Sequence, residues 1–161
     1  AIHPEIQSAE RAANLSAMLS RFTGPLTVMA GALFDSAGRV LITQRPPGKA
    51  LAGRWEFPGG KLHEGEEAFA GLVRELREEL DVEVHAGERL IRYSHAYPAR
   101  VVWLDMWVVS SWIGEARGLE GQALKWVDVP ALPAEDILEA DRPIIEALLS
   151  LDLRHGNATG P

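Results

Sequence analysis

The chain has 161 residues, no cysteine and a formal charge of −7, which comes from 16 Lys and Arg against 23 Asp and Glu. Without cysteine it can form neither a disulfide framework nor a thiolate metal site, so oxygen atoms or histidines would have to hold any metal. The acidic balance, with no basic run and no long apolar stretch, argues against direct binding of nucleic acid and against a membrane protein. We expect a cytoplasmic monomer with one main domain.

The distribution of apolar and turn-forming residues predicts an N-terminal extension at residues 1–24, a domain at residues 25–153 and a flexible C-terminal tail at residues 154–161. Within the domain, strand-like apolar runs are separated by loops that contain Gly and Pro. In chain order we expect two strands at 26–34 and 40–43 joined as a β-hairpin, loops at 46–54 and 58–60, a helix at 67–80, strands at 82–95, 101–113 and 124–129, and a helix at 141–151. This order predicts an α/β fold in which a mixed sheet carries helices on its faces.

The helix expected at 67–80 lies in the most acidic part of the chain. Residues 64–82 contain seven Asp and Glu and two Arg, a net charge of −5. At about 100° of rotation per residue, Glu75, Glu78 and Glu79 share one side of this helix, and its apolar residues form one buried face: Phe69, Leu72, Val73, Leu76 and Leu80. Carboxylates one turn apart destabilise a helix, but they are the ligands that Mg²⁺ and Mn²⁺ prefer. The spacing therefore favours a metal site.

The same segment resembles the sequence motif of a known family. Gly60, then five residues, Glu66, then seven residues and the run at 74–82 (Arg-Glu-Leu-Arg-Glu-Glu-Leu-Asp-Val) match the Nudix box at every specified position except one. Asp81 stands where the box has Gly, and we expect a left-handed helix cap there at a small cost in stability. Residues 42–45, 55–61 and 118–122 extend the resemblance to the MutT-like branch of the Nudix hydrolases, over about residues 26–150.

The resemblance implies a Nudix-type α/β/α sandwich that hydrolyses (deoxy)nucleoside triphosphates to the monophosphate and pyrophosphate. It implies Mg²⁺ as the cofactor, with Mn²⁺ as a substitute, and an oxidised nucleotide such as 8-oxo-dGTP as the substrate. Two alternatives stay open: a pyrophosphohydrolase of CTP or dCTP, and a non-catalytic nucleotide sensor. Because the chain keeps all four glutamates of the box, the sensor is the weaker alternative.

The resemblance also assigns roles to individual residues. The metal ligands would be the Gly59 carbonyl, Glu75, Glu78, Glu79 and Glu120. Glu75, Glu78 and Glu120 would take part in catalysis, and either Glu75 or Glu120 would accept a proton from the attacking water. Gly60 and a salt bridge between Glu66 and Arg74 would brace the box. The substrate would contact Arg45, Glu56, Phe57, Pro58, Gly59, Lys61, Arg100 and Asp141.

Asp141 bears on the choice of base. Family members that act on oxidised guanine often carry Asn at this position, whereas Asp also occurs in relatives that act on cytosine nucleotides. An ionised carboxylate accepts hydrogen bonds but cannot donate one, so it suits a base that presents N–H groups. A protonated Asp141 could still serve oxidised guanine. Without the resemblance, Arg45 and Arg100 would equally well be solvent-facing strand ends and Glu120 an ordinary turn residue.

Overall fold

The computed structural model describes residues 11–12, 14–15 and 26–156. Most of the extension expected at residues 1–24 lies outside these residues, as do residues 157–161. The last helix continues to Gly156, and therefore reaches into the segment that we expected to be a tail. None of the helices in the described part of the chain has the length and apolar character that a membrane crossing requires.

The described domain consists of two runs of strands, each followed by helices. Its elements are β1 (Leu26–Ala32), β2 (Val40–Gln44), β3 (Trp55–Glu56), β4 (Gly59–Lys61), α2 (Ala68–Leu80), β5 (Glu83–Ala96), β6 (Val101–Ile113), β7 (Leu124–Val127), the 3-10 helices η1 (Val129–Ala134) and η2 (Glu139–Asp141), and α3 (Arg142–Gly156).

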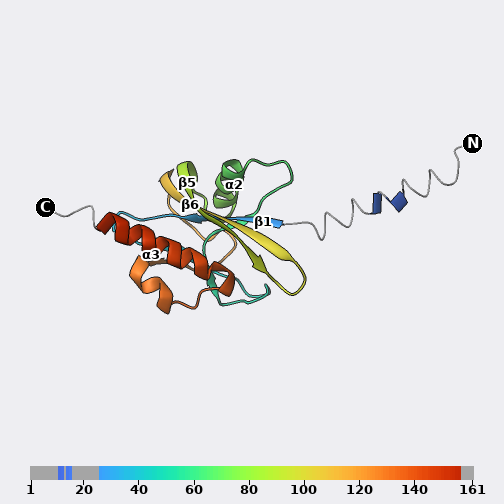
Figure 1. Ribbon diagram of the computed structural model, residues 1–161. Coiled ribbons are helices and arrows are strands. Elements are labelled where there is room, and N and C mark those ends of the chain that lie inside the picture. The colour runs from blue at the N-terminus through green and yellow to red at the C-terminus, as the bar shows by residue number, and fades with distance from the viewer. Residues whose placement is uncertain (1–10, 13, 16–25, 157–161) are drawn as a thin grey trace, which may run out of the picture.

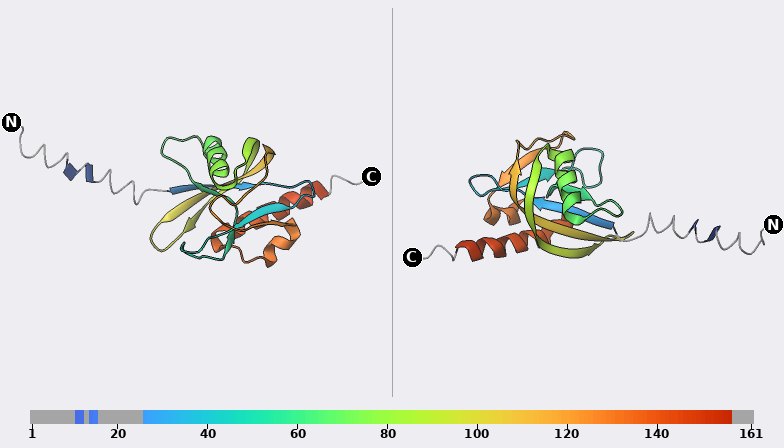
Figure 2. Two further views of the ribbon diagram at one scale, coloured as in Figure 1. Left: turned by 180° about the vertical axis from the view of Figure 1, so that it is seen from behind. Right: turned by 90° about the horizontal axis from the view of Figure 1, so that it is seen from above.

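The strands form two sheets. The first has the order β4-β1-β6-β5, in which β1 and β6 are parallel and the outer pairs are antiparallel. The second is antiparallel, with the order β3-β2-β7. Helix α2 lies on one side of the first sheet and α3 on the other (Figures 1 and 2). The predicted α/β/α sandwich with a mixed sheet is therefore confirmed, and the separate second sheet is an addition to it.

The predicted hairpin between the first two strands is wrong. β1 and β2 belong to different sheets. The segments that connect them meet at a single bridge between Phe34 and Val40, with hydrogen bonds from the Leu41 N–H to the Leu33 carbonyl at 3.0 Å and from the Asp35 N–H to the Arg39 carbonyl at 2.9 Å. β1 instead pairs with β6 along its whole length, from Leu26 to Ala32. This position between two strands satisfies its backbone groups on both edges, which a two-stranded hairpin could not do.

The segment before α2, expected to be a loop, contains the short edge strand β4. Its residues pair with Val28, Met29 and Ala30 of β1. The sequence Pro58-Gly59-Gly60 has no strand propensity of its own, so the pairing partner is what makes it extended. The consequence is that the chain leading into α2 is held against β1.

Alternation along β1 divides the interior into two cores. Met29 and Leu33 pack on the side of α2, together with its fully buried residues Leu72, Leu76 and Leu80. Ala30 and Ala32 face the other way, toward the second sheet and α3. Because successive residues of a strand point to opposite faces, one strand anchors both layers.

Both ends of α2 carry defined caps. At the N-terminus the Glu67 side chain accepts hydrogen bonds from the backbone N–H groups of Phe69 and Ala70, at 3.2 and 3.0 Å. At the C-terminus Asp81 has φ 58° and ψ 36°, and its N–H donates to the Arg77 carbonyl. The left-handed cap predicted at the departure from the box is therefore present, and aspartate tolerates this conformation better than most residues with a Cβ.

Candidate active site

A cavity of about 450 Å³ opens between β1, β4, α2 and two loops. This volume is in the range of small-molecule sites. Its polar lining comes from segments far apart in the sequence: Arg45, Lys49, Glu56, Lys61, Glu75, Glu79, Glu120 and Asp141. Seven of these eight are residues to which the family resemblance assigns a contact with metal or substrate, and the eighth, Lys49, is a rim residue for which no role was predicted.

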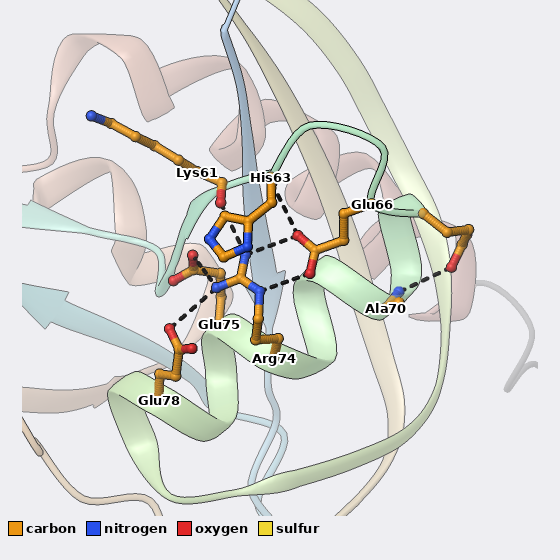
Figure 3. A network of polar contacts seen from close by, with 8 residues as sticks. Lys61, His63, Glu66, Ala70, Arg74, Glu75 and Glu78 are labelled. Atoms are coloured by element: carbon orange, nitrogen blue, oxygen red, sulfur yellow. Dashed lines mark hydrogen bonds and ion pairs between the residues drawn. The ribbon is translucent and has the colours of Figure 1, made fainter.

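Arg74 organises one side of this cavity. Its guanidinium forms two hydrogen bonds with the Glu66 carboxylate, at 2.7 and 2.9 Å, and a third with the Lys61 carbonyl at 3.1 Å (Figure 3). The Arg74 hydrogen bonds, and a further one from the His63 N–H, lower the pKa of Glu66 to about 2. The predicted brace between Glu66 and Arg74 is thus formed, and it ties the loop after β4 to the middle of α2.

The same guanidinium orients two further carboxylates of α2. Its remaining nitrogen lies 2.9 Å from Glu75 and 3.2 Å from Glu78. The Glu75 side chain is largely buried and lines the cavity, whereas the Glu78 side chain is 59% exposed and does not line it. Figure 3 shows both carboxylates turned toward Arg74.

Glu79 lies deeper. Its carboxylate accepts a 3.0 Å hydrogen bond from the Gly59 N–H, and it lines the cavity. Burial raises the pKa of Glu79 to about 8, and the nearby charges of Glu120, Glu56 and Glu75 act in the same direction against the Gly59 hydrogen bond. Several negative groups therefore crowd one space.

Gly59 and Gly60 permit this close packing. Gly59 has φ 156°, and a Cβ there would collide with the Met29 carbonyl. A Cβ on Gly60 would overlap the Glu75 carboxylate. Only residues without a side chain let β4 lie against β1 and α2 at once.

Glu120 reaches the cavity on the loop between β6 and β7. That loop is fixed to the end of α2, because the N–H groups of Arg117 and Leu119 donate to the carbonyls of Leu80 and Glu79, at 2.9 and 3.1 Å. These carbonyls are among those that a helix C-terminus leaves without an intrahelical partner. The loop thus caps the helix and places Glu120 in the cavity that Glu75 and Glu79 also line.

Gln122 has a part in this arrangement that sequence reasoning missed. Its side chain accepts a 2.9 Å hydrogen bond from the Glu120 N–H and donates a 3.1 Å bond to the Glu79 carbonyl. It is buried, although nothing in its type predicts that. Neither its residue type nor its spacing from Glu120 is a specific signal for this role.

The carboxylates suit a divalent cation. Among the described residues no three Asp, Glu or His side chains are gathered closely enough to enclose a metal ion. Each box carboxylate instead bonds a positive or N–H group: Arg74 for Glu75 and Glu78, and Gly59 for Glu79. The donors are all oxygens, and the charges of Glu120, Glu56 and Glu75 add to the rise that burial causes in the pKa of Glu79. This chemistry fits a hard cation such as Mg²⁺ or Mn²⁺.

The cavity is also lined by side chains expected to contact the base, namely Arg45, Glu56 and Asp141. Arg45 forms a salt bridge of 3.2 Å with Glu56. Asp141 is buried, and its carboxylate accepts a 3.0 Å hydrogen bond from the Phe57 N–H. The Tyr93 hydroxyl donates a 2.7 Å hydrogen bond to the carbonyl of Ala140. This bond holds η2 in place, and Asp141 is the last residue of η2.

Two residues predicted to bind substrate do not line this cavity. Pro58 is buried, and its carbonyl accepts a 2.9 Å hydrogen bond from the Gly31 N–H, which is a structural contact. Arg100 lies at the turn between β5 and β6, where its carbonyl accepts from the Tyr97 N–H. The structure brings Phe57, Gly59 and Lys61 to the cavity as expected.

Comparison with known proteins agrees with this arrangement. The model of the NUDIX domain matches residues 29–147. The chain belongs to the Nudix family. Nudix hydrolases use divalent metal ions, which is consistent with the oxygen-rich site.

Individual Nudix relatives cover most of the chain. It is 36% identical over 120 residues to the CTP pyrophosphohydrolase of Escherichia coli, covering 74% of this chain and 89% of that protein. It is also 36% identical over 125 residues to the 8-oxo-dGTP diphosphatase of Haemophilus influenzae, covering 78% and 92%. The solution structure of the E. coli ORF135 protein superposes with a TM-score of 0.73 at 34% identity, covering 81% and 92%.

The burial of Asp141 leads to a prediction about stability and pH. Burial raises the pKa of Asp141 to about 7, with Glu56 adding to the rise while the Phe57 N–H and Arg45 oppose it. An unfolded aspartate titrates near 3.9, so the folded state holds the extra proton between roughly pH 4 and 7, and Asp141 lowers stability as pH rises through that window. Asp141→Asn removes this loss and keeps an oxygen for the Phe57 N–H. We expect its free energy of unfolding, relative to the unaltered protein, to rise from pH 5 to pH 7 by at most about 1.4 kcal/mol per pH unit.

Urea unfolding of both proteins at pH 5, 6, 7 and 8 measures this difference, and titrations that are common to both cancel in it. A difference that stays constant across the series would contradict the assignment to Asp141.

Proposed function

We propose that this protein is a Mg²⁺-dependent nucleoside triphosphate pyrophosphohydrolase that releases the monophosphate and pyrophosphate, with 8-oxo-dGTP as its preferred substrate. The observation that carries the proposal is that Glu75, Glu79 and Glu120 line one cavity. The Arg45–Glu56 pair and the buried Asp141 line the same cavity. A nucleotide needs such a site, with carboxylates and a cation for its polyphosphate and polar groups for its base.

The carboxylates of Glu75, Glu78, Glu79 and Glu120 and the Gly59 carbonyl would hold Mg²⁺, or Mn²⁺ in its place. When bound, the cation lowers the pKa of a water and offsets phosphate charge. Glu75 or Glu120 accepts the proton of the attacking water. Arg74 keeps Glu75 in position, and Lys61 balances part of the charge on the phosphates.

The choice of 8-oxoguanine as the preferred nucleobase depends on Asp141. One of its oxygens accepts the Phe57 N–H, so the carboxyl group is fixed in direction. Because its pKa is about 7, both the accepting and the donating form are populated near neutral pH. A carboxyl group with both forms can pair with an oxidised guanine, which presents both an acceptor and an additional N–H group.

A cytosine nucleotide is the second candidate. It is supported by the curated relative named CTP pyrophosphohydrolase, which is as similar to this chain as the 8-oxo-dGTP diphosphatase of H. influenzae. In that case an ionised Asp141 would accept a hydrogen bond from the amino group of the base.

Comparison of kcat/KM for 8-oxo-dGTP, dGTP, dCTP and CTP with Mg²⁺ tests the proposal. We expect kcat/KM for 8-oxo-dGTP to exceed that for dGTP by about tenfold or more, because a site that bonds the added N–H discriminates against the base that lacks it. Chromatography of the products should show the monophosphate and pyrophosphate. A maximum for CTP or dCTP would favour the second candidate, and tight nucleotide binding without pyrophosphate release would favour a sensor.

A further inference from the structure

Lys49 stands at the rim of the cavity, on the loop between β2 and β3. Its ammonium lies 3.6 Å from the Glu120 carboxylate, which projects from the loop between β6 and β7. The two side chains are 54% and 48% exposed. This ion pair therefore crosses the opening beside the box carboxylates, between two loops that are far apart in the sequence.

The loop that carries Lys49 is fixed in place. The Arg45 side chain donates a 2.7 Å hydrogen bond to the carbonyl of Ala50, the residue next to Lys49. The Gln44 side chain donates to the Gly53 carbonyl at 3.0 Å, and the Gly53 N–H donates to the Arg45 carbonyl at 3.0 Å. These bonds also hold Leu51 in a left-handed conformation, φ 58°, which leucine rarely adopts. These contacts fix the backbone beside Lys49, a residue that lines the cavity.

The charged side chains that line the cavity indicate which kind of ligand Lys49 could bind. Three of its cationic side chains face five carboxylates: Arg45, Lys49 and Lys61 against Glu56, Glu75, Glu79, Glu120 and Asp141. Arg45 is engaged by Glu56 and by the Ala50 carbonyl. The Lys49 ammonium forms an exposed ion pair with Glu120, and exposed pairs of this kind are weak and readily exchanged.

We infer that Lys49 is a phosphate-binding residue, which pairs with Glu120 in the free protein and transfers to the polyphosphate chain of a bound nucleotide. This inference rests on the proposed function, because it takes the ligand to be a nucleoside polyphosphate. A phosphate carries more negative charge than a single carboxylate, so it would attract the ammonium more strongly than Glu120 does. Lys49 lies 3.6 Å from Glu120, and its charge also acts to lower the pKa of Glu56. It thus lies beside Glu56, which is proposed to contact substrate, and beside Glu120, a proposed metal ligand, where the polyphosphate chain of a bound nucleotide would run. Lys49 and a cation compete for Glu120, so the ammonium also weakens binding of a cation in the absence of nucleotide.

Two binding measurements on Lys49→Gln test the inference without using turnover. Isothermal titration with inorganic tripolyphosphate in Mg²⁺ should give an affinity about tenfold lower than that of the unaltered protein, since one charge-assisted hydrogen bond is lost. Titration with Mn²⁺ alone, followed by electron paramagnetic resonance, should give an affinity about two- to threefold higher, since Glu120 is released from an exposed pair. Lys49→Arg should keep most of the affinity for tripolyphosphate.

Lys125→Gln is the matched control. Lys125 pairs with Glu135 at 2.9 Å and lies over the Trp55 ring, outside the cavity lining. It should change neither affinity. An unchanged affinity of Lys49→Gln for tripolyphosphate, an equal fall in both variants, or an unchanged affinity for Mn²⁺ would overturn the inference. If the unaltered protein hydrolyses no nucleotide but the tripolyphosphate difference persists, the proposed function fails and the assignment of Lys49 to phosphate stands.

Discussion

Glu79→Gln is expected to lower kcat by about a hundredfold to a thousandfold with the fold intact, the loss typical when a group that stabilises transition-state charge is removed. Glu79 is a box carboxylate that lines the cavity and accepts a hydrogen bond from the Gly59 N–H. A glutamine has the same shape and can still accept that hydrogen bond through its amide oxygen. It cannot supply the negative charge that a divalent cation needs. The variant therefore tests the effect of the Glu79 charge on kcat while the shape and packing of the side chain stay the same.

Steady-state kinetics on the preferred nucleotide and circular dichroism of the folded protein measure the two effects. Glu146→Gln is a suitable control, because Glu146 lies on the exposed side of α3. It should leave kcat unchanged. Turnover of Glu79→Gln within threefold of the unaltered protein, or activity of that variant without any divalent metal, would exclude Glu79 as an essential ligand.

Arg74→Lys is expected to lower kcat/KM by about tenfold to a hundredfold, the range seen when groups that orient metal ligands are altered. Arg74 contacts Glu66, Glu75, Glu78 and the Lys61 carbonyl at once. A lysine keeps the charge but has a single ammonium, which cannot reproduce the planar two-point contact with Glu66. The Glu75 carboxylate would lose its fixed direction, and the melting temperature should fall as the loop after β4 loosens.

Arg77→Lys tests whether this effect is specific. Arg77 is the exposed arginine of the same helix, one turn closer to its C-terminus. It should change kcat/KM little. Equal effects of the two substitutions on kcat/KM would show that Arg74 acts through general helix stability and not by orienting Glu75. A rise of KM alone, with kcat unchanged, would point to substrate binding.

The local part of the site was predictable from the sequence because its physics is local. A period of 3.6 residues places Leu72, Leu76 and Leu80 on the buried face of α2 and puts the box glutamates together on another. The contact between Glu66 and Arg74 follows from the family motif, and the left-handed cap at Asp81 follows from the position of the missing glycine. Each of these depends on residues within about two turns of one another.

The errors concern contacts between distant segments. The chain between β1 and β2 has the turn residues of a hairpin, but turn chemistry does not decide which strand gains more by pairing elsewhere. β1 pairs with β6, whose paired residues lie 76 positions further along the chain, and β4 is extended only because β1 is its neighbour. Neither pairing has a signature in the local sequence.

By itself, therefore, the sequence determined the acidic helix, its buried face, the mixed α/β class and the family to which the chemistry belongs. The tertiary structure alone decided that Gln122 fixes Glu120 to the end of α2 and that Lys49 faces Glu120 across the cavity. It also decided that Asp141 is buried against Phe57. The physical reason is that helix periodicity and caps arise from bonds between near neighbours. The burial and electrostatic field of a site arise instead from segments that meet only after the sheets have formed.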